Sequence, residues 1–335
     1  MSAEVVDLGP RPPGVPINGH RQPRICLGMP LYNQHEFLEE ALQSILAQTY
    51  GDFRLIILDD SSDPEPGKIV QRYAAKDGRI RYSKNVIRKG LVDNWRACFR
   101  HAGEVDYFAW VSDHDVWNPE WLEKMVRVLN ANPDTVLVYP LCIRITAAGE
   151  RIEKPPRYFS TAGMDERRRV TAVCRDARYY GKMVYGLFRA RALRQAGVYR
   201  RVLFPDVVLL YELSLQGDFR QVEEELWFLR QVAKFSIARQ KKSLFVRKPW
   251  YIYLPWPFVN AVVVSWNAAA ISATGKFRHS HSYVGFEMAF WYLYRYASRL
   301  GEGTWIGSYH DLIRLKTPWI KKLICNFQIK RQSKL

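Results

Sequence analysis

The chain has 335 residues, of which 48% are hydrophobic, and both values are ordinary for a folded protein of one large domain or two. A disordered chain is thereby excluded. Five cysteines, an odd number without a C-x-x-C pair, exclude a disulfide framework and a zinc knuckle and favour a reducing compartment. We therefore expect a cytoplasmic protein. Residues 1–23 contain five prolines and no apolar run, and we interpret them as a flexible leader, not as an export signal.

The net charge of +17 comes from the second half of the chain alone. Residues 1–150 contain 17 Lys and Arg against 20 Asp and Glu, whereas residues 151–335 contain 33 against 13. A slightly acidic half joined to a strongly basic half is typical of an enzyme whose C-terminal part faces a polyanion. Anionic lipid, a phosphorylated substrate and nucleic acid all meet this description.

Short apolar runs alternate with helical periodicity through the first half of the chain. Apolar residues recur three or four positions apart around residues 37–46 and 91–99, which predicts helices there. Asn118, Pro119 and Glu120 predict another helix start, as N-cap, first-turn proline and first-turn acid. The alternation indicates an α/β fold with a mainly parallel sheet flanked by helices. The predicted strands are Arg24–Met29, Phe53–Leu58, Arg79–Tyr82, Tyr107–Val111 and Thr135–Cys142.

Acidic residues follow the second and fourth predicted strands, at the edge where open α/β sheets bind their ligands. Asp59 and Asp60 come directly after the second strand, and Asp113, His114 and Asp115 follow the fourth. Two carboxylates at positions i and i+2 of a turn can converge on one hard divalent cation. The chain has neither G-x-G-x-x-G after its first strand nor a P-loop motif. We therefore expect carboxylates and a metal ion to bind any phosphate, in place of a glycine-rich loop.

Three segments occur in this part of the chain in a fixed order: MPLYN at residues 29–33, LEEALQSILAQTY at 38–50 and LDDSSD at 58–63. Their order and spacing closely resemble the opening of bacterial family-2 glycosyltransferases with the GT-A fold. The resemblance continues through the D-x-D element at 113–115 and extends over about residues 24–235. It implies a GT-A catalytic domain over residues 24–240.

For the donor, the resemblance implies a nucleotide-sugar pocket in which Asp60 accepts a hydrogen bond from the base. It places Asp113 near the ribose and the sugar, and it makes Asp115, together with Asp113, a ligand of a Mn²⁺ or Mg²⁺ ion that bridges the diphosphate. Such an ion neutralises the charge that develops on the leaving nucleoside diphosphate. His114 stands where many relatives have another Asp, and it either senses the metal or points away. The other implied donor-binding residues are Pro30, Tyr32, Asn33, Asn94 and Arg230, the last near the phosphates.

Two later segments resemble the acceptor side of the family: VYGLFR at residues 184–189 and FPDVVLLYELSLQG at 204–217. The second implies that Asp206 is the base that takes the proton from the attacking hydroxyl in an inverting transfer. A structural interpretation of Asp206 is an N-cap, because Pro205 and the apolar residues after it predict a helix that begins there. Both interpretations can hold, since a helix N-terminus keeps a carboxylate ionised. Glu212 is the reserve candidate for the base.

Beyond about residue 240 the resemblance fades, and residues 241–335 are interpreted as a basic, aromatic-rich helical extension. Residues 249–275 contain no charged side chain, and their Trp and Tyr cluster at one end. Residues 286–300 are again aromatic, and the chain after Asp311 contains seven Lys or Arg and no acid. Three interpretations stay open: attachment to an anionic membrane surface or an acceptor-binding platform, a buried helical subdomain, and a transmembrane span. The first predicts a peripheral protein on the inner face of the membrane.

Taken together, these features predict a metal-dependent inverting glycosyltransferase of the hexosyltransferase type. The implied donor is a UDP- or dTDP-sugar, and the implied acceptor is a saccharide or lipid-linked hydroxyl in the synthesis of a cell-surface glycan or glycolipid. A sugar nucleotidyltransferase would share the α/β domain, but it normally carries a glycine-rich basic loop where this chain has residues 30–33. A non-catalytic module that binds membrane or nucleic acid would explain the charge but not the paired acids. We therefore expect no nucleic-acid partner.

Overall fold

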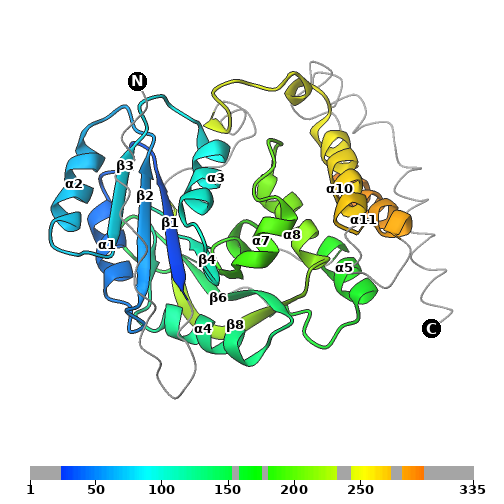
Figure 1. Cartoon of the computed structure of the whole chain (residues 1–335), viewed down its shortest axis with the longest axis horizontal. Helices are drawn as coiled ribbons and strands as arrows, with labels where there is room; N and C mark the ends of the chain where they lie inside the picture. The colour runs from blue at the N-terminus through cyan, green and yellow to red at the C-terminus, as the bar shows by residue number, and fades with distance from the viewer. Residues whose placement is uncertain (1–23, 153–157, 176–179, 232–242, 273–280, 298–335) are drawn as a thin grey trace.

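The computed structural model describes residues 24–152, 158–175, 180–231, 243–272 and 281–297. The predicted leader at 1–23 and the basic end of the chain lie outside these residues. Within them, eight strands form a sheet in the order β3-β2-β1-β4-β7-β6-β8-β5 (Figure 1). The strands are β1 (Ile25–Leu31), β2 (Phe53–Asp59), β3 (Ile80–Lys84), β4 (Tyr107–Trp110), β5 (Val116–Trp117), β6 (Thr135–Ile145), β7 (Leu187–Arg189) and β8 (Asp218–Arg230).

The sheet is mainly parallel, as the alternation of apolar runs and helices predicts. β1 pairs in parallel with β2 and β4, β2 pairs in parallel with β3, and β6 pairs in parallel with β8. The short β7 is antiparallel to both β4 and β6, so it joins the two parallel halves. Strand β7 was not among the predicted strands, because three residues are too few to give a periodic signal. The predicted α/β fold class is confirmed.

Helices cover both faces of the sheet, because its strands are apolar on both faces. One buried core contains residues of α1, α2 and α4, and the other contains residues of α3, α5, α7 and α8. The second core continues into α10 and α11, so the described part of the C-terminal extension packs onto the α/β part of the chain. The helices are α1 (Leu38–Leu46), α2 (Glu65–Ala74), α3 (Leu91–His101), α4 (Trp121–Ala131), α5 (Glu166–Arg175), α6 (Tyr180–Met183), α7 (Ala190–Ala196), α8 (Pro205–Ser214), η1 (Trp250–Tyr253), α10 (Trp256–Ser272) and α11 (His281–Tyr296).

Two expectations about helices are settled by the structure. Helix α4 begins at Trp121, not at Pro119, because Asn118 forms a turn instead of an N-cap. The Oδ1 atom of Asn118 accepts the amide of Glu120 at 2.9 Å, and its carbonyl oxygen accepts the amide of Trp121 at 3.0 Å. In the part of the chain that the structure describes, none of the helices combines the length and the apolar character that crossing a bilayer requires.

Gly186 lets the chain enter β7 directly against β6. A Cβ atom at Gly186 would lie 2.8 Å from Leu137 Cδ1 and 2.9 Å from Tyr139 Cβ, and it would also collide with the carbonyl oxygen of Val138. These are atoms of a central strand, so they have little room to move. The close approach also fixes the position of the neighbouring residue, Tyr185, in the site described below.

We expect Gly186→Ala to lower the free energy of unfolding by about 1–3 kcal/mol, the usual cost of an overpacked core. Thermal unfolding of the purified variant measures this change. Gly78→Ala is the matched control, because a Cβ atom there would meet nothing within 4 Å. Equal unfolding temperatures for the two variants would show that β6 can yield at this point.

Candidate active site

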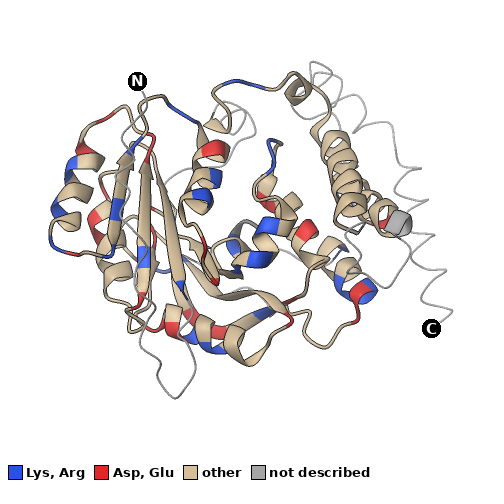
Figure 2. Ribbon diagram, viewed as in Figure 1, with Lys and Arg blue, Asp and Glu red and all other residues tan. Residues whose placement is uncertain are grey.

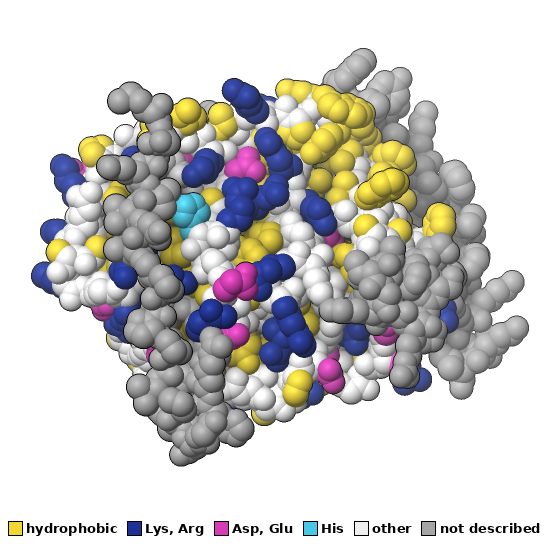
Figure 3. Space-filling view, viewed as in Figure 1, with side chains coloured by type: hydrophobic (Ala, Val, Ile, Leu, Met, Phe, Trp, Pro, Cys, Tyr) yellow, Lys and Arg dark blue, Asp and Glu magenta, His cyan; other side chains and the backbone are white. Residues whose placement is uncertain are grey.

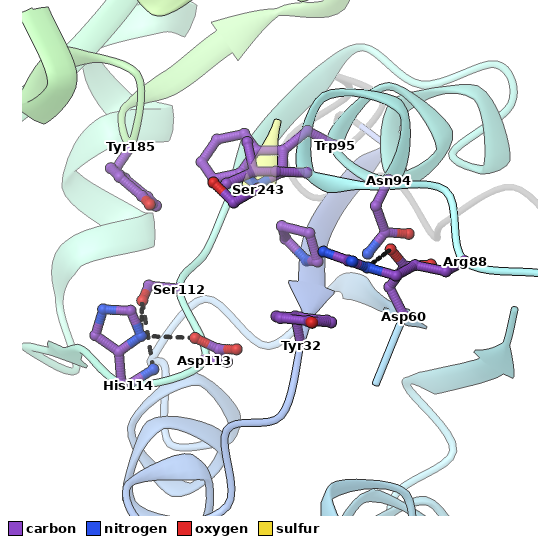
Figure 4. A pocket seen from close by; sticks show the side chains of 12 residues that line it. Tyr32, Asp60, Arg88, Asn94, Trp95, Ser112, Asp113, His114, Tyr185 and Ser243 are labelled. Atoms are coloured by element: carbon purple, nitrogen blue, oxygen red, sulfur yellow. Dashed lines mark hydrogen bonds and ion pairs between the residues drawn. The ribbon is translucent and has the colours of Figure 1, made fainter. Parts of the chain in front are cut away.

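A pocket of about 190 Å³ opens at the carboxyl ends of β1, β2 and β4 (Figure 4). Figure 4 shows Asp60, Arg88 and Asn94 on one side and Asp113 and Tyr185 on the other, with Tyr32 between the two groups. Five of the seven predicted donor-binding residues line the pocket, and Asn33 and Arg230 do not. The lining residues are Pro30, Tyr32, Asp60, Arg88, Leu91, Asn94, Trp95, Ser112, Asp113, His114, Tyr185 and Ser243.

Asn33 fastens the loop after β1 to the loop after β2. Its backbone is in the left-handed region, with φ of 52°, which Asn tolerates better than most residues. Its Oδ1 atom accepts the amides of Ser62 and Asp63 at 2.9 and 3.2 Å, and its own amide donates to Ser61 Oγ at 2.7 Å. Asn33 therefore holds together the loops that carry Tyr32 and Asp60, and its predicted contact with the donor stays a prediction.

Asp60 organises the loop between β3 and α3. Its Oδ1 atom accepts the Lys89 amide at 2.7 Å, and its Oδ2 atom accepts the Gly90 amide at 2.8 Å. The Asn85 side chain donates to Asp60 Oδ1 and to Asn94 Oδ1, both at 3.0 Å. Asp60 is thus a buried carboxylate that lines the pocket and is already satisfied by three donors, so it holds its position before any ligand binds.

Arg88 lies in the same loop and was not predicted as a site residue. Its guanidinium lies over the Tyr32 ring, 4.6 Å from the ring centroid, and its Nε atom is 4.0 Å from Asp60 Oδ2. The Tyr32 side chain is 45% exposed, so the pair presents an open aromatic surface with a cation beside it. Arg88 and Lys89 form a basic pair in a loop at the ligand-binding edge of the sheet. This pair is a sequence signal that could have identified Arg88 as a site residue.

The turn after β4 separates the two carboxylates of the D-x-D element. Asp113 lines the pocket, and its Oδ1 atom is 2.6 Å from His114 Nδ1. Burial lowers the pKa of His114, but the hydrogen bond and the charge of Asp113 outweigh burial, so the net shift is upward. Asp115 is fully buried, which raises the pKa of its carboxyl to about 6. Its oxygens accept the Trp227 indole N–H at 3.1 Å and the Arg230 amide at 2.8 Å.

The carboxylates of this turn differ in how well they fit a divalent metal. Across the ranges that the structure describes, no three His, Cys, Asp or Glu side chains are grouped to enclose an ion. Mg²⁺ that is shared with substrate phosphates needs only one or two protein carboxylates. Asp113 fits this requirement because it lines the pocket, whereas Asp115 faces the interior with both oxygens bound by N–H groups. The assignment of Asp115 as a ligand stays a prediction.

Arg230 clamps the turn after β4 from inside the protein. Its side chain is buried and donates to the carbonyl oxygens of His114 at 3.1 Å and Thr146 at 3.3 Å, and to that of Ala147. It also forms an ion pair of 2.6 Å with Glu40. The guanidinium is occupied by these partners and does not line the pocket, and its predicted contact with the phosphates stays a prediction.

Asp206 is the second residue of α8. The N-cap interpretation is wrong, because Phe204 occupies the N-cap position, in the left-handed region with φ of 51° and ψ of 53°. Burial raises the pKa of Asp206 to about 6, against the opposing effect of the backbone amides of Val207 and Asp206. Burial, followed by the charges of Asp115, Asp113 and Asp206, raises the pKa of Tyr185. Tyr185 thus lies within electrostatic reach of both the pocket acids and Asp206.

Glu212, the reserve candidate, lies in the interior and does not line the pocket. Its Oε1 atom accepts Arg200 Nε at 3.0 Å and Asn267 Nδ2 of α10 at 2.6 Å. Burial raises its pKa to about 7, although Arg200 opposes the shift. These contacts tie α8 to the C-terminal helices, and they indicate a structural role.

The chain was compared with known proteins. Residues 26–186 match glycosyl transferase family 2. The "Putative glycosyltransferase EpsE" of Bacillus subtilis (strain 168) is 35% identical over 108 residues, which are 32% of this chain and 38% of that protein. The "Uncharacterized protein y4gI" of Sinorhizobium fredii (strain NBRC 101917 / NGR234) is 32% identical over 136 residues, which are 39% of this chain and 14% of that protein. The chain thus spans well under two thirds of the length of these relatives.

A solved structure has the same fold. The Staphylococcus aureus protein TarS, as residues 1–349 in complex with UDP-GlcNAc, superposes with a TM-score of 0.57 at 13% identity. The match covers 89% of this chain and 77% of that one. Residues 26–186 thus match a family-2 glycosyltransferase domain, and the chain has the GT-A fold. The resemblance seen in the sequence is therefore confirmed.

Replacement by Asn should have different effects at Asp113 and at Asp115. We expect Asp113→Asn to lower metal-dependent activity at least 100-fold, of the order seen when one charged group at a reacting centre is lost, without changing the unfolding temperature. Asp115→Asn puts an amide NH₂ against an N–H donor, which costs about 1–3 kcal/mol of stability.

Thermal unfolding and a manganese titration of activity separate the two roles. If Asp115→Asn kept the unfolding temperature of the unmodified protein and lost its response to manganese, Asp115 would be the metal ligand. The structural role assigned to Asp115 would then be wrong.

Proposed function

We propose that the chain is a metal-dependent inverting glycosyltransferase of the hexosyltransferase type. The observation that carries the proposal is the pocket that Asp113 and Tyr185 line together at the carboxyl ends of the parallel strands. The charge of Asp206 contributes to the raised pKa of Tyr185, and burial raises the pKa of Asp206 itself to about 6. A carboxylate with such a pKa is ionised at neutral pH and basic enough to accept a proton.

We assign the nucleotide base to the side of the pocket formed by Tyr32, Asp60 and Arg88. The exposed Tyr32 ring offers a stacking surface, and the guanidinium 4.6 Å from its centroid adds positive charge beside it. Pro30 and Asn94 line the same pocket. A UDP- or dTDP-sugar is the proposed donor, and the complex of TarS with UDP-GlcNAc supports a uridine nucleotide.

The proposed metal, Mn²⁺ or Mg²⁺, would be held by Asp113. Asp115, the other ligand predicted from the sequence, is bound within the protein by Trp227 and Arg230. When bound, the metal supplies positive charge that stabilises the leaving diphosphate. Ser112 and His114 hold the Asp113 side of the pocket, since His114 Nδ1 lies 3.1 Å from Ser112 Oγ and 2.6 Å from Asp113 Oδ1 (Figure 4). Arg88 supplies positive charge on the side of the pocket assigned to the nucleotide base.

The reaction proceeds by one displacement in this proposal. The acceptor hydroxyl oxygen attacks the anomeric carbon from the face opposite the diphosphate. The bond from that carbon to the phosphate oxygen breaks, and its electron pair leaves with the nucleoside diphosphate. Asp206 takes the hydroxyl proton and later releases it to solvent, so the product is a glycoside of inverted configuration. The proposed acceptor is a saccharide or lipid-linked hydroxyl in the synthesis of a cell-surface glycan or glycolipid.

Release of nucleoside diphosphate tests the proposal directly. We would incubate the full chain with a panel of UDP- and dTDP-sugars, with and without manganese, and measure the diphosphate released. Release from at least one donor that depends on manganese is the expected result. Release of pyrophosphate from a sugar phosphate and a nucleoside triphosphate would assign a nucleotidyltransferase instead.

We expect Asp206→Asn to lower kcat by about two to four powers of ten, the range for loss of a positioned general base. The amide cannot take up the proton, but it keeps the size of the side chain, so donor affinity and folding should survive. Glu212→Gln is the control, because Glu212 faces Arg200 and Asn267 and not the pocket. Steady-state kinetics and donor binding by calorimetry measure both variants. If the Glu212→Gln variant were inactive and the Asp206→Asn variant active, Glu212 and not Asp206 would be the general base.

The pH profile follows from the raised pKa of Asp206. Below about pH 6 this carboxyl is protonated and cannot accept a proton, so kcat/KM should fall about tenfold for each unit of pH. Above pH 6 the acid limb should level off. A profile with its acid limb near pH 4, the value for an ordinary carboxyl, would contradict a buried base.

A further inference from the structure

The C-terminal helices carry an unusual number of exposed large apolar side chains. On α10 and the turn before it, Leu254, Phe258, Val262 and Trp266 recur at intervals of four residues, and Phe258, Val262 and Trp266 are 55%, 53% and 77% exposed. On α11, Phe286, Phe290 and Tyr294 recur at the same interval, and Phe286 is 74% exposed. Residues four apart lie on one side of a helix. We call these seven residues the apolar face.

The apolar face does not pack into the core of the protein, because the opposite side of α10 is the side that is buried there. Asn260 Nδ2 donates to the Leu203 carbonyl at 2.6 Å and to the Tyr292 hydroxyl at 2.7 Å. Trp256 packs against Phe204, with ring centroids 4.5 Å apart. Ser265 Oγ donates to the Gly285 carbonyl at 3.0 Å, which joins α10 to α11 at the residues next to Trp266 and Phe286. The rotation of both helices is therefore set, and it turns the apolar face outward.

The charges around the apolar face match a negatively charged partner. Helix α10 has no charged residue along its whole length (Figure 2), and Arg247 and Lys248, both exposed, come just before η1. On the described parts of η1, α10 and α11 the acid is Glu287, and it is directed inward to Thr171 Oγ1 at 2.7 Å and to Arg167 at 3.8 Å. Hydrophobic side chains gather over α10 in Figure 3. Exposed patches of this kind, rimmed by polar residues, mark interaction sites.

We propose that the apolar face binds the surface of a bilayer that contains anionic lipid, with Arg247 and Lys248 at the headgroups. Trp250 and Trp266, 76% and 77% exposed, have the side chain that is enriched at the boundary between lipid and water. An apolar face combined with flanking cations is the arrangement of helices that lie in this boundary without crossing the membrane.

The proposal does not depend on the glycosyltransferase activity. Helix α10 contacts the segment that leads into α8, through Phe204 and the Leu203 carbonyl, and Asp206 is two residues beyond Phe204. A bilayer on the apolar face would therefore lie across α10 from Asp206.

Flotation of the full chain with lipid vesicles tests the proposal. We expect binding to vesicles of phosphatidylcholine with phosphatidylglycerol, and weak binding to phosphatidylcholine alone. Phe258→Ser combined with Trp266→Ser should lower the partition coefficient at least tenfold. Arg247→Gln combined with Lys248→Gln should lower it about tenfold on the anionic vesicles only. The control is Ile152→Ser with Tyr158→Ser, two exposed apolar residues outside α10 and α11, which should bind as the unmodified chain does.

Two further measurements keep the result clear. Thermal unfolding should be the same for all variants, since the substituted side chains are exposed. Sedimentation of the full chain without vesicles should show a monomer. A dimer that Phe258→Ser with Trp266→Ser dissociates would assign the apolar face to a second copy and overturn the proposal. Equal flotation of that variant and the control, or no binding of the unmodified chain at low salt, would also overturn it.

Discussion

The position of the turn after β4 depends on Arg230, whose backbone binds Asp115 and whose side chain binds the carbonyl oxygen of His114. The Arg230 amide donates to Asp115 at 2.8 Å, and its guanidinium binds the carbonyl oxygen of His114 and the Glu40 carboxylate. Removing the Arg230 side chain would leave the carbonyl oxygens of His114, Thr146 and Ala147 without these donors, at a cost of about 1–3 kcal/mol for each buried group left unsatisfied. The clamp fixes Asp115 inward and so leaves Asp113, two residues earlier, to line the pocket.

The same division between support and contact runs through the site. Asn33 holds two loops together, Asp60 and Asn94 bind neighbouring segments and also line the pocket, and Asp113 and Arg88 present polar groups to it. Residues that orient others are satisfied by hydrogen bonds within the protein, which makes them rigid before a ligand arrives. The left-handed Phe204 ahead of Asp206 fits this pattern, because strained backbone in proteins clusters at functional sites.

Much of this arrangement could be predicted from the sequence, and the misses have physical causes. Parallel strands bring their carboxyl ends to one edge, so the acids after β2 and β4 were expected together, and Asp60 and Asp113 do line one pocket. Whether a side chain in a turn faces the interior or the solvent depends on partners distant in the chain. The burial of Asp115 by Trp227 and Arg230 could therefore not be predicted from the residues around it. Arg88 was not predicted because it lies in a loop, where the sequence has no hydrophobic periodicity. The resemblance faded before α10, where only the apolar spacing remained.

A crystal structure of the full chain with UDP and Mn²⁺ would test the central claim most directly. We predict the uracil beside Tyr32 and Asp60, and an anomalous manganese peak within about 2.2 Å of an Asp113 oxygen, the usual length of a bond from such an ion to oxygen. The Asp115 carboxylate should remain bound to Trp227 and Arg230. Manganese bound by Asp115, with these hydrogen bonds broken, or a nucleotide outside the pocket would contradict the account.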